Sequence, residues 1–284
     1  MNYRHIYHAG NFADVFKHIV LALLLDHLRQ KDKPFFVLDT HAGIGLYDLE
    51  REEARKTGEA AGGIGKLWAH HGDAPPGVKQ YLDIVRRVNR QGGERLKFYP
   101  GSPVLVREML RDNDRLVSGE LHPDDFKTLR GAVGHDRRVS VEPADGYGLI
   151  KAQLPPDERR GLVLVDPPFE VTNEFDLMLK GLKHGYERWA TGIYALWYTV
   201  KDLKPVEKFH RALADAGIPK VMASHFMIRP PASPDKFNGC GMIIVNPPWT
   251  LRGHLDTIGP WLAGVLADGS RTRYEATEIT GETP

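Results

Sequence analysis

The sequence predicts a doubly wound α/β fold, in which helices cover both faces of a mostly parallel β-sheet. Short apolar runs alternate with segments of helical periodicity along most of the chain. Two of these runs end in turns built from small residues or prolines, at the sheet edge where doubly wound folds bind ligands. We expect the last apolar run to form an antiparallel strand.

Composition limits the class of protein. The chain has 284 residues, of which 42% are hydrophobic and 26% are charged, so it is neither disordered nor fibrous. Its 38 Lys and Arg residues balance 37 Asp and Glu residues, so a nucleic acid would have to bind through local basic patches. Cys240 is the only cysteine, which excludes an intrachain disulfide and a cysteine zinc site. We expect a protein of the reducing cytoplasm.

The predicted elements follow the chain in a regular order. Residues 11–29 have the spacing of an amphipathic helix, and their most apolar stretch is too short to span a bilayer, so no membrane partner is expected. Residues 46–96 are predicted to be a small helical insert, with helices around 64–70 and 78–90. The predicted strands are residues 35–38, 116–119, 139–141, 162–165, 193–197, 221–227 and 242–245.

Small residues directly follow the first predicted strand. Gly43 and Gly45 would let a cofactor approach the backbone at the carboxyl end of this strand. A tight turn without a ligand explains the glycines equally well. Further along, Glu120 and Asp145-Gly146 follow the next two strands, where carboxylates can accept hydrogen bonds from a ribose diol or an adenine amino group. Either acid could instead cap a helix.

The strongest motif is Asp166-Pro167-Pro168-Phe169, which follows a buried strand. Two prolines remove backbone donors and stiffen the turn, so carbonyl oxygens would face the cleft. Such a corner suits an amino group, which can donate one N–H to the Asp166 carboxylate and one to a carbonyl while its lone pair turns towards a methyl donor. Phe169 would stack on the base. The alternative is an ordinary acid-proline turn.

A second, similar motif occurs at Asn246-Pro247-Pro248-Trp249. An asparagine side chain does not accept a proton as a carboxylate does. The preceding strand is also the one expected to run antiparallel, so its end would face away from the ligand edge. We interpret this second motif as structural.

The amino terminus combines rings with positive charge at Tyr3, Arg4 and His5. This combination suits contacts with an RNA backbone and stacking on its bases, although a frayed terminus is the alternative. Histidines such as His8 and His70 have no acid or thiol in the sequence pattern that would complete a metal site. No metal is therefore predicted.

Together these motifs resemble the bacterial 23S rRNA adenine-N6 methyltransferase J family. The likeness covers nearly the whole chain and is carried by the motifs Tyr3-Arg4-His5, His8-Ala9-Gly10-Asn11, Ala13-Asp14-Val15, Lys17-His18, Asp39-Thr40-His41-Ala42-Gly43, Tyr99-Pro100-Gly101-Ser102-Pro103, Glu120-Leu121-His122-Pro123, Asp166-Pro167-Pro168, Tyr194-Ala195-Leu196-Trp197-Tyr198 and Asn246-Pro247-Pro248-Trp249. Phe169 stands where members of this family often have tyrosine.

The resemblance implies a class I methyltransferase domain over residues 1–284, with the insert at 46–96 inside it. It also implies that Asp166 accepts the proton, with Pro167 and Phe169 in the same catalytic corner, and that Tyr3 contacts the RNA. The cofactor S-adenosylmethionine would be bound by His18, His41, Ser102, Glu120, Asp145 and Gly146. Periodicity alone places His18 on a helix in the protein core and gives it no role in cofactor binding.

The leading hypothesis is S-adenosylmethionine-dependent methylation of the N6 amino group of one adenine in 23S rRNA. The target base should be unpaired or flipped out to enter a pocket of this kind. One alternative is a DNA adenine-N6 methyltransferase, because the same corner suits either nucleic acid. Another is a noncatalytic RNA-binding protein with a vestigial cofactor fold.

Overall fold

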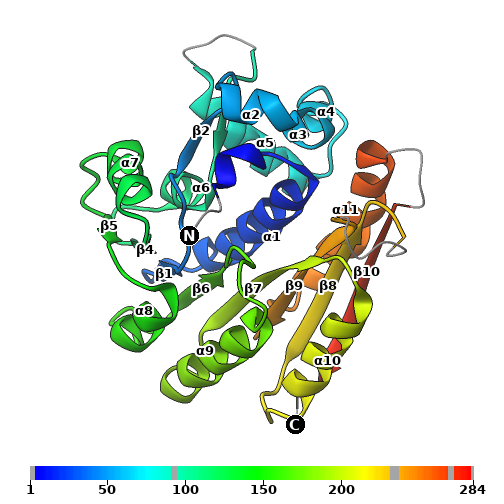
Figure 1. The fold of residues 1–284 in the computed structure, drawn as a ribbon. Helices are drawn as coiled ribbons and strands as arrows, with labels where there is room; N and C mark the ends of the chain where they lie inside the picture. The colour runs from blue at the N-terminus through cyan, green and yellow to red at the C-terminus, as the bar shows by residue number, and fades with distance from the viewer. Residues whose placement is uncertain (1–3, 91–94, 231–236, 268–271, 283–284) are drawn as a thin grey trace.

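One mixed β-sheet organises the part of the chain that the structure describes. The structure is a computed structural model, and it describes residues 4–90, 95–230, 237–267 and 272–282 (Figure 1). The sheet has the strand order β10-β8-β9-β7-β6-β1-β4-β5. Its strands are β1 (Phe36–Asp39), β4 (Arg115–Gly119), β5 (Val139–Glu142), β6 (Gly161–Val165), β7 (Ile193–Val200), β8 (Val221–Met227), β9 (Gly239–Val245) and β10 (Arg273–Thr280).

The centre of the sheet is parallel, as predicted. Strands β5, β4, β1, β6 and β7 pair in parallel, with Phe36 opposite both Arg115 and Gly161. Because parallel neighbours share one direction, their carboxyl ends meet at a single edge. The mostly parallel sheet expected from the sequence is therefore confirmed.

The antiparallel part of the sheet is larger than predicted. Strand β9 runs antiparallel to both β7 and β8, which confirms the expectation for residues 242–245. A further strand, β10, pairs antiparallel with β8 at the edge and is missing from the predicted set. Its residues are exposed or only partly buried, since one face of an edge strand meets solvent. It therefore lacks the continuous apolar run that identified the other strands.

Helices cover both faces of the sheet. Alternate residues of β1 point to opposite sides, so Val37 belongs to one hydrophobic core while Phe36 and Leu38 belong to the other. The first core is covered by α1 (Phe12–Arg29), α5 (Pro76–Val88), α6 (Ser102–Met109) and α11 (Leu251–Leu266). The second is covered by α8 (Gly146–Gln153), α9 (Glu174–Arg188) and α10 (Leu203–Ala214), which line one side of the sheet in Figure 1. Helix α7 (Pro123–Val133) packs at the β5 edge.

Helix α1 is buried along most of its length. Asn11 caps it by accepting hydrogen bonds from the backbone N–H groups of Ala13 and Asp14. The predicted helix at 11–29 is thus confirmed, with Asn11 as its cap. Three of its buried residues, Asp14, Lys17 and His18, are polar or charged. Within the described residues, no helix combines the length and the apolar character needed to cross a membrane.

The segment predicted as a helical insert, residues 46–96, begins with a short strand that was not predicted, β2 (Leu46–Asp48), which pairs with β3 (Phe98–Pro100) just after the segment. It contains α2 (Glu52–Thr57), α3 (Glu59–Gly62), α4 (Ile64–Trp68) and α5, which gather beside α1 (Figure 1). At Gly63 a Cβ would lie 2.1 Å from the Gly10 carbonyl oxygen, so glycine permits contact with the amino-terminal segment, which carries the short helix η1 (His5–Tyr7). The insert boundaries at 46–96 stay a prediction.

Gly161 permits the pairing of the two central strands and gives a stability test. Its φ is +155°, and a Cβ there would lie 1.8 Å from the Phe36 carbonyl oxygen. We expect Gly161→Ala to lower the free energy of unfolding by about 3 kcal/mol or more, because the backbone of β1 would have to move. Urea unfolding measures this change.

The matched control is Gly131→Ala in α7, where a Cβ would meet no atom within 4 Å. We expect this variant to gain about 0.5–1 kcal/mol, because alanine favours a helix over glycine. Equal stabilities for the two variants would contradict the steric argument.

Candidate active site

The carboxyl ends of the parallel strands open onto one large cavity. Its volume is ≈ 770 Å³, within the range of small-molecule sites and large enough for a nucleoside cofactor with a second base. The cavity gathers almost all the predicted site residues: His5, His18, His41, Ser102, Glu120, Asp145, Gly146, Asp166, Pro167 and Phe169. Residues from separate parts of the chain thus meet as the sequence predicted, while their individual roles stay predictions.

Glu120 and Asp145, which both line the cavity, are held in place by backbone N–H groups. The Glu120 carboxylate accepts hydrogen bonds from the N–H groups of Gly43 at 3.0 Å and His122 at 2.8 Å. Asp145 accepts from the N–H of Gly148 at 2.8 Å and thereby caps α8. For Asp145, the helix-cap alternative is therefore correct, but the same side chain also lines the cavity. Both carboxylates are positioned before any ligand binds.

Gly146 leaves room for the loop that follows β1. A Cβ at this position would lie 2.4 Å from the Thr40 carbonyl oxygen and 2.8 Å from Cε1 of His41. No side chain can occupy that space without moving the loop after β1. The glycine therefore lets α8 begin directly against the loop that carries His41.

His18 faces the cavity from the buried helix α1. Its Nδ1 shares a hydrogen bond of 2.8 Å with the Tyr99 hydroxyl, whereas its Nε2 is buried without a partner among the described residues. Burial, reinforced by the charge of Lys17, lowers the pKa of His18 to about 3, so the ring is neutral. An unsatisfied nitrogen at a cavity wall fits a polar ligand such as S-adenosylmethionine.

Asp39, at the end of β1, is the second unsatisfied group near the cavity. The side chain is fully buried, and within the described residues neither carboxylate oxygen makes a hydrogen bond of regular geometry. Burial raises the pKa of Asp39 to about 7, with the Asp166 charge adding to the rise and the Ser102 hydroxyl opposing it. Sequence reasoning assigned no role to Asp39 itself.

The corner after β6 forms the opposite wall of the cavity. Phe169 adopts a φ of +52°, which turns the chain sharply after the two prolines. Its ring meets Phe175 and Trp197 edge-on, with centroid separations of 5.3 and 6.0 Å. Trp197, on β7, also lines the cavity. The corner is thus held by aromatic packing around the Phe169 ring.

Asp166 is paired with a buried lysine that the sequence reasoning did not select. Nζ of Lys17 contacts Oδ2 of Asp166 and lies 2.9 Å from Oδ1 of Asp14. Asp14 in turn accepts from the Gly10 N–H and pairs with Nε2 of His5, both at 2.9 Å. The network therefore joins the amino-terminal segment to the acceptor corner through α1.

The charges in this network stabilise one another. Burial opposes the ammonium form of Lys17, but Asp14 and Asp166 together raise its pKa above the usual value. Burial likewise opposes the Asp14 carboxylate, but His5 and Lys17 hold its pKa well below the usual range. The only sequence signal was two opposite charges three residues apart on an otherwise apolar helix.

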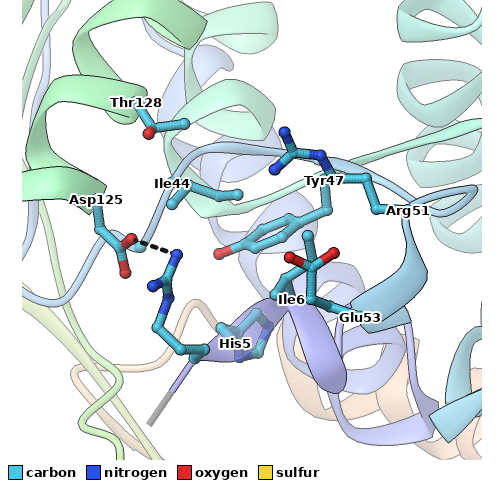
Figure 2. A pocket seen from close by; sticks show the side chains of 10 residues that line it. His5, Ile6, Ile44, Tyr47, Arg51, Glu53, Asp125 and Thr128 are labelled. Atoms are coloured by element: carbon cyan, nitrogen blue, oxygen red, sulfur yellow. Dashed lines mark ion pairs between the residues drawn. The ribbon is translucent and has the colours of Figure 1, made fainter. Parts of the chain in front are cut away.

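Of the three predicted RNA-contacting residues, the structure describes Arg4 and His5, which share a small pocket. Tyr3 lies outside the described residues. Arg4 lines a separate small pocket of ≈ 50 Å³ and forms an ion pair of 3.3 Å with Asp125 (Figure 2). His5 lines both this pocket and the large cavity. Arg51 also reaches the small pocket, beside Tyr47 (Figure 2). The structure thus brings His5, but not Arg4, to the large cavity.

The second proline-proline motif has a structural role, as interpreted from the sequence. Nδ2 of Asn246 donates to the carbonyl oxygens of Ala190 and Gly192 at 2.8 and 2.7 Å, which fixes the connection between α9 and β7. Because β9 is antiparallel, Asn246 stands at the opposite edge from the cavity. Trp249 is 88% exposed.

Among the described residues, no cluster of three or more potential ligands could hold a metal.

The burial of Asp39 predicts a pH dependence of stability. With a folded pKa near 7 and an ordinary value of 3.8, the folded state keeps its proton between these limits while the unfolded state releases it. The contribution of this group to stability therefore falls as pH rises from 4 to 7, by on the order of 3 kcal/mol. We expect Asp39→Asn to reduce this fall and to raise the thermal midpoint of the ligand-free protein at pH 8.

The control is Asp114→Asn, another buried carboxylate, which accepts hydrogen bonds from the Phe35 N–H and from Arg111. This variant should be less stable than the wild type at pH 8, because a satisfied carboxylate is lost. Thermal unfolding from pH 4 to 8 measures both. A destabilised Asp39→Asn variant at pH 8 would show that the Asp39 charge is compensated.

Comparison with known proteins identifies the family. A family model described as "Ribosomal RNA large subunit methyltransferase D, RlmJ" matches residues 32–277. Proteins named Ribosomal RNA large subunit methyltransferase J are similar: that of Haemophilus influenzae is 42% identical over 99% of this chain and 100% of its own length, and that of Escherichia coli K12 is 43% identical over 94% of each chain. The crystal structure of LPL1258 from Legionella pneumophila superimposes with a TM-score of 0.88 and 34% identity, covering 95% of this chain and 98% of that one. The chain therefore belongs to the RlmJ family of ribosomal RNA large subunit methyltransferases.

Proposed function

We propose that the protein transfers a methyl group from S-adenosylmethionine to the N6 amino group of an unpaired adenine in 23S rRNA. The observation that carries the proposal is the position of the Asp166-Pro167-Pro168-Phe169 corner, which opens into the same cavity as Glu120 and Asp145. A methyl donor and an amino acceptor can therefore meet there. The names of the relatives, which are large-subunit rRNA methyltransferases, support RNA as the substrate.

The cofactor half of the cavity suits S-adenosylmethionine, which supplies an electrophilic methyl group on a positively charged sulfur. The carboxylates of Glu120 and Asp145 would accept hydrogen bonds from the ribose diol and the adenine amino group. His18 Nε2, which lacks a partner within the described chain, would hydrogen-bond to a polar group of the cofactor. Gly146 and the loop bearing His41 would hold the nucleoside between them, and Ser102 would contact it from α6.

The acceptor half suits an exocyclic amine. The lone pair of such an amine is delocalised into the ring, so its two N–H groups must be held for the nitrogen to become nucleophilic. One N–H would donate to Asp166 and the other to a carbonyl oxygen of the corner, where Pro167 and Pro168 offer no competing donor. Oδ2 of Asp166 contacts Lys17, and no hydrogen bond to Oδ1 occurs within the described residues, so Oδ1 can serve the amine.

The reaction forms a nitrogen–carbon bond and breaks the carbon–sulfur bond of the donor. The methylated nitrogen then carries an excess proton, which Asp166 accepts and passes to solvent. Lys17 holds the Asp166 carboxylate in one orientation and keeps a positive charge beside it. We expect most of the acceleration to come from this alignment, because preorganised geometry and charge lower the barrier without reorganisation.

The RNA would approach over the amino-terminal segment. An adenine in a loop enters the cavity at lower cost than a paired one, because less stacking and pairing is lost. His5, at the cavity wall, and Arg4, in the small pocket beside it, would contact the flanking chain, together with Tyr3. We assign no step of the proposed reaction to a metal ion.

Removal of Asp166 tests the acceptor corner. We expect Asp166→Ala and the isosteric Asp166→Asn to lower the rate of methyl transfer by about 100-fold or more, because each loses the proton acceptor. Labelled S-adenosylmethionine is incubated with rRNA from a strain that lacks its own enzyme, and the nucleosides are analysed for N6-methyladenosine.

The same assay separates the competing functions. Cofactor affinity of both variants, measured by calorimetry, should stay within about threefold of the wild type, since Asp166 acts on the acceptor. With DNA added beside the rRNA, label that survives ribonuclease but not deoxyribonuclease would indicate a DNA substrate. A wild-type protein that binds no cofactor would indicate the noncatalytic alternative, and undiminished label with Asp166→Ala would sink the proposed mechanism.

The two proline-proline motifs provide a matched pair of variants. We expect Phe169→Ala to lower methyl transfer by about 10-fold or more, because stacking on a base contributes about 1–3 kcal/mol. Phe169→Tyr should retain activity. Trp249→Ala removes the corresponding aromatic ring of the second motif at the far edge of the sheet and should leave the rate unchanged. A loss of activity in Trp249→Ala that equals the loss in Phe169→Ala would contradict the structural assignment of the second motif.

A further inference from the structure

A hydrogen bond between two side chains connects helices α8 and α9 across the cavity wall. The Tyr147 hydroxyl donates to Oε1 of Glu174 at a distance of 2.7 Å. Tyr147 directly follows Gly146 in the first turn of α8, and Glu174 is the first residue of α9, the helix that follows the acceptor corner. Both side chains line the large cavity. The pair therefore spans the two halves that methyl transfer must align.

Both partners are held in place by their surroundings. Glu174 is only 5% exposed, which is unusual for an acid at a helix start. The Tyr147 ring meets His41 edge-on at 5.3 Å, and on its other side Gly181 leaves space for it, since a Cβ there would lie 2.8 Å from the ring. Burial raises the pKa of both groups, so the phenol keeps the proton that it donates.

The acceptor corner needs an anchor of this kind. Residues 170–173, between Phe169 and α9, form no regular secondary structure, and Val171 is 48% exposed. Asn173 precedes α9 without a side-chain cap hydrogen bond. The side chain of Glu174 ties the start of α9 to Tyr147 on α8.

A simpler account of Glu174 does not explain its position. An acid in the first turn of a helix interacts favourably with the helix dipole. Asp176 lies in the same turn and is exposed, so it provides that interaction without burial. Burying a carboxylate is costly unless it is hydrogen-bonded, and Tyr147 supplies the bond.

We propose that the Tyr147–Glu174 hydrogen bond is a strut that sets the separation between the donor and acceptor pockets, which makes both side chains positioning residues for methyl transfer. The inference rests on the proposed function, because it presumes a donor at Gly146 and an acceptor at Asp166. Reacting atoms must approach to roughly 3–3.5 Å, and an error of about 1 Å can cost about 100-fold in rate. A strut between α8 and α9 controls that distance.

The test compares three variants under single-turnover conditions, so that product release does not mask the transfer step. Tyr147→Phe keeps the ring but removes the donor, and we expect the methyl-transfer rate to fall by about 10-fold while cofactor affinity stays within about threefold. Glu174→Ala should behave in the same way. Glu174→Gln retains an oxygen that accepts from the phenol and should restore most of the rate.

Two further measurements separate positioning from general damage. Combining Tyr147→Phe with Glu174→Ala should slow transfer no more than either change alone, because both remove one interaction. The controls are Tyr186→Phe and Asp176→Ala, which remove a hydroxyl and an acid from the same helix α9. Neither residue has a described hydrogen bond to the cavity wall, and both variants should match the wild type.

The outcomes distinguish this inference from the proposed function. A wild-type enzyme that methylates rRNA beside an equally fast Tyr147→Phe variant would overturn the strut alone. Weaker cofactor binding by the Tyr147→Phe variant at an unchanged transfer rate would also overturn the strut, because Tyr147 would then be a cofactor contact. A wild-type enzyme that binds the cofactor but methylates no adenine would overturn the proposed function, and the strut with it.

Discussion

The site depends on the ion pairs formed by the buried ammonium group of Lys17. It lies between the carboxylates of Asp14 and Asp166, so one charge connects helix α1 to the corner after β6. Each partner would be costly to bury alone, and loss of one would leave another uncompensated in an apolar core. The same network reaches His5 through Asp14. Charge pairing thus orders the amino-terminal segment and the acceptor corner together.

Two of the buried polar groups without partners among the described residues lie at or beside the cavity. Asp39 and Nε2 of His18 are buried and unsatisfied within the described residues, although most of the surrounding core is apolar. Native proteins tolerate such groups chiefly where they serve a ligand or a reaction. The Tyr147–Glu174 pair in the cavity wall is, by contrast, hydrogen-bonded. The site therefore combines a fixed frame with a few open hydrogen-bonding positions.

Two nearly identical motifs acquire different roles because of strand direction. Asp166-Pro167-Pro168-Phe169 ends a parallel strand and opens into the cavity, whereas Asn246-Pro247-Pro248-Trp249 ends an antiparallel strand at the opposite edge. The Asn246 amide fixes the connection between α9 and β7, whereas the Asp166 carboxylate pairs with the ammonium group of Lys17. Local sequence makes the stiff corner, and its place in the sheet decides what that corner faces.

The sequence by itself determined the parallel strands, the long first helix and the turns after the strands that carry Glu120, Asp145 and Asp166, because period and turn chemistry are local properties. The expected cofactor contacts of His18, His41 and Ser102 came from the family resemblance instead. It did not reveal β10, whose half-exposed pattern lacks an apolar run. Nor did it reveal the partner of Asp166, since Lys17 is 149 residues away along the chain, or the pairing of Tyr147 with Glu174. Contacts of this kind arise only when separate elements pack, so only the tertiary structure decided which charges and hydroxyl groups meet.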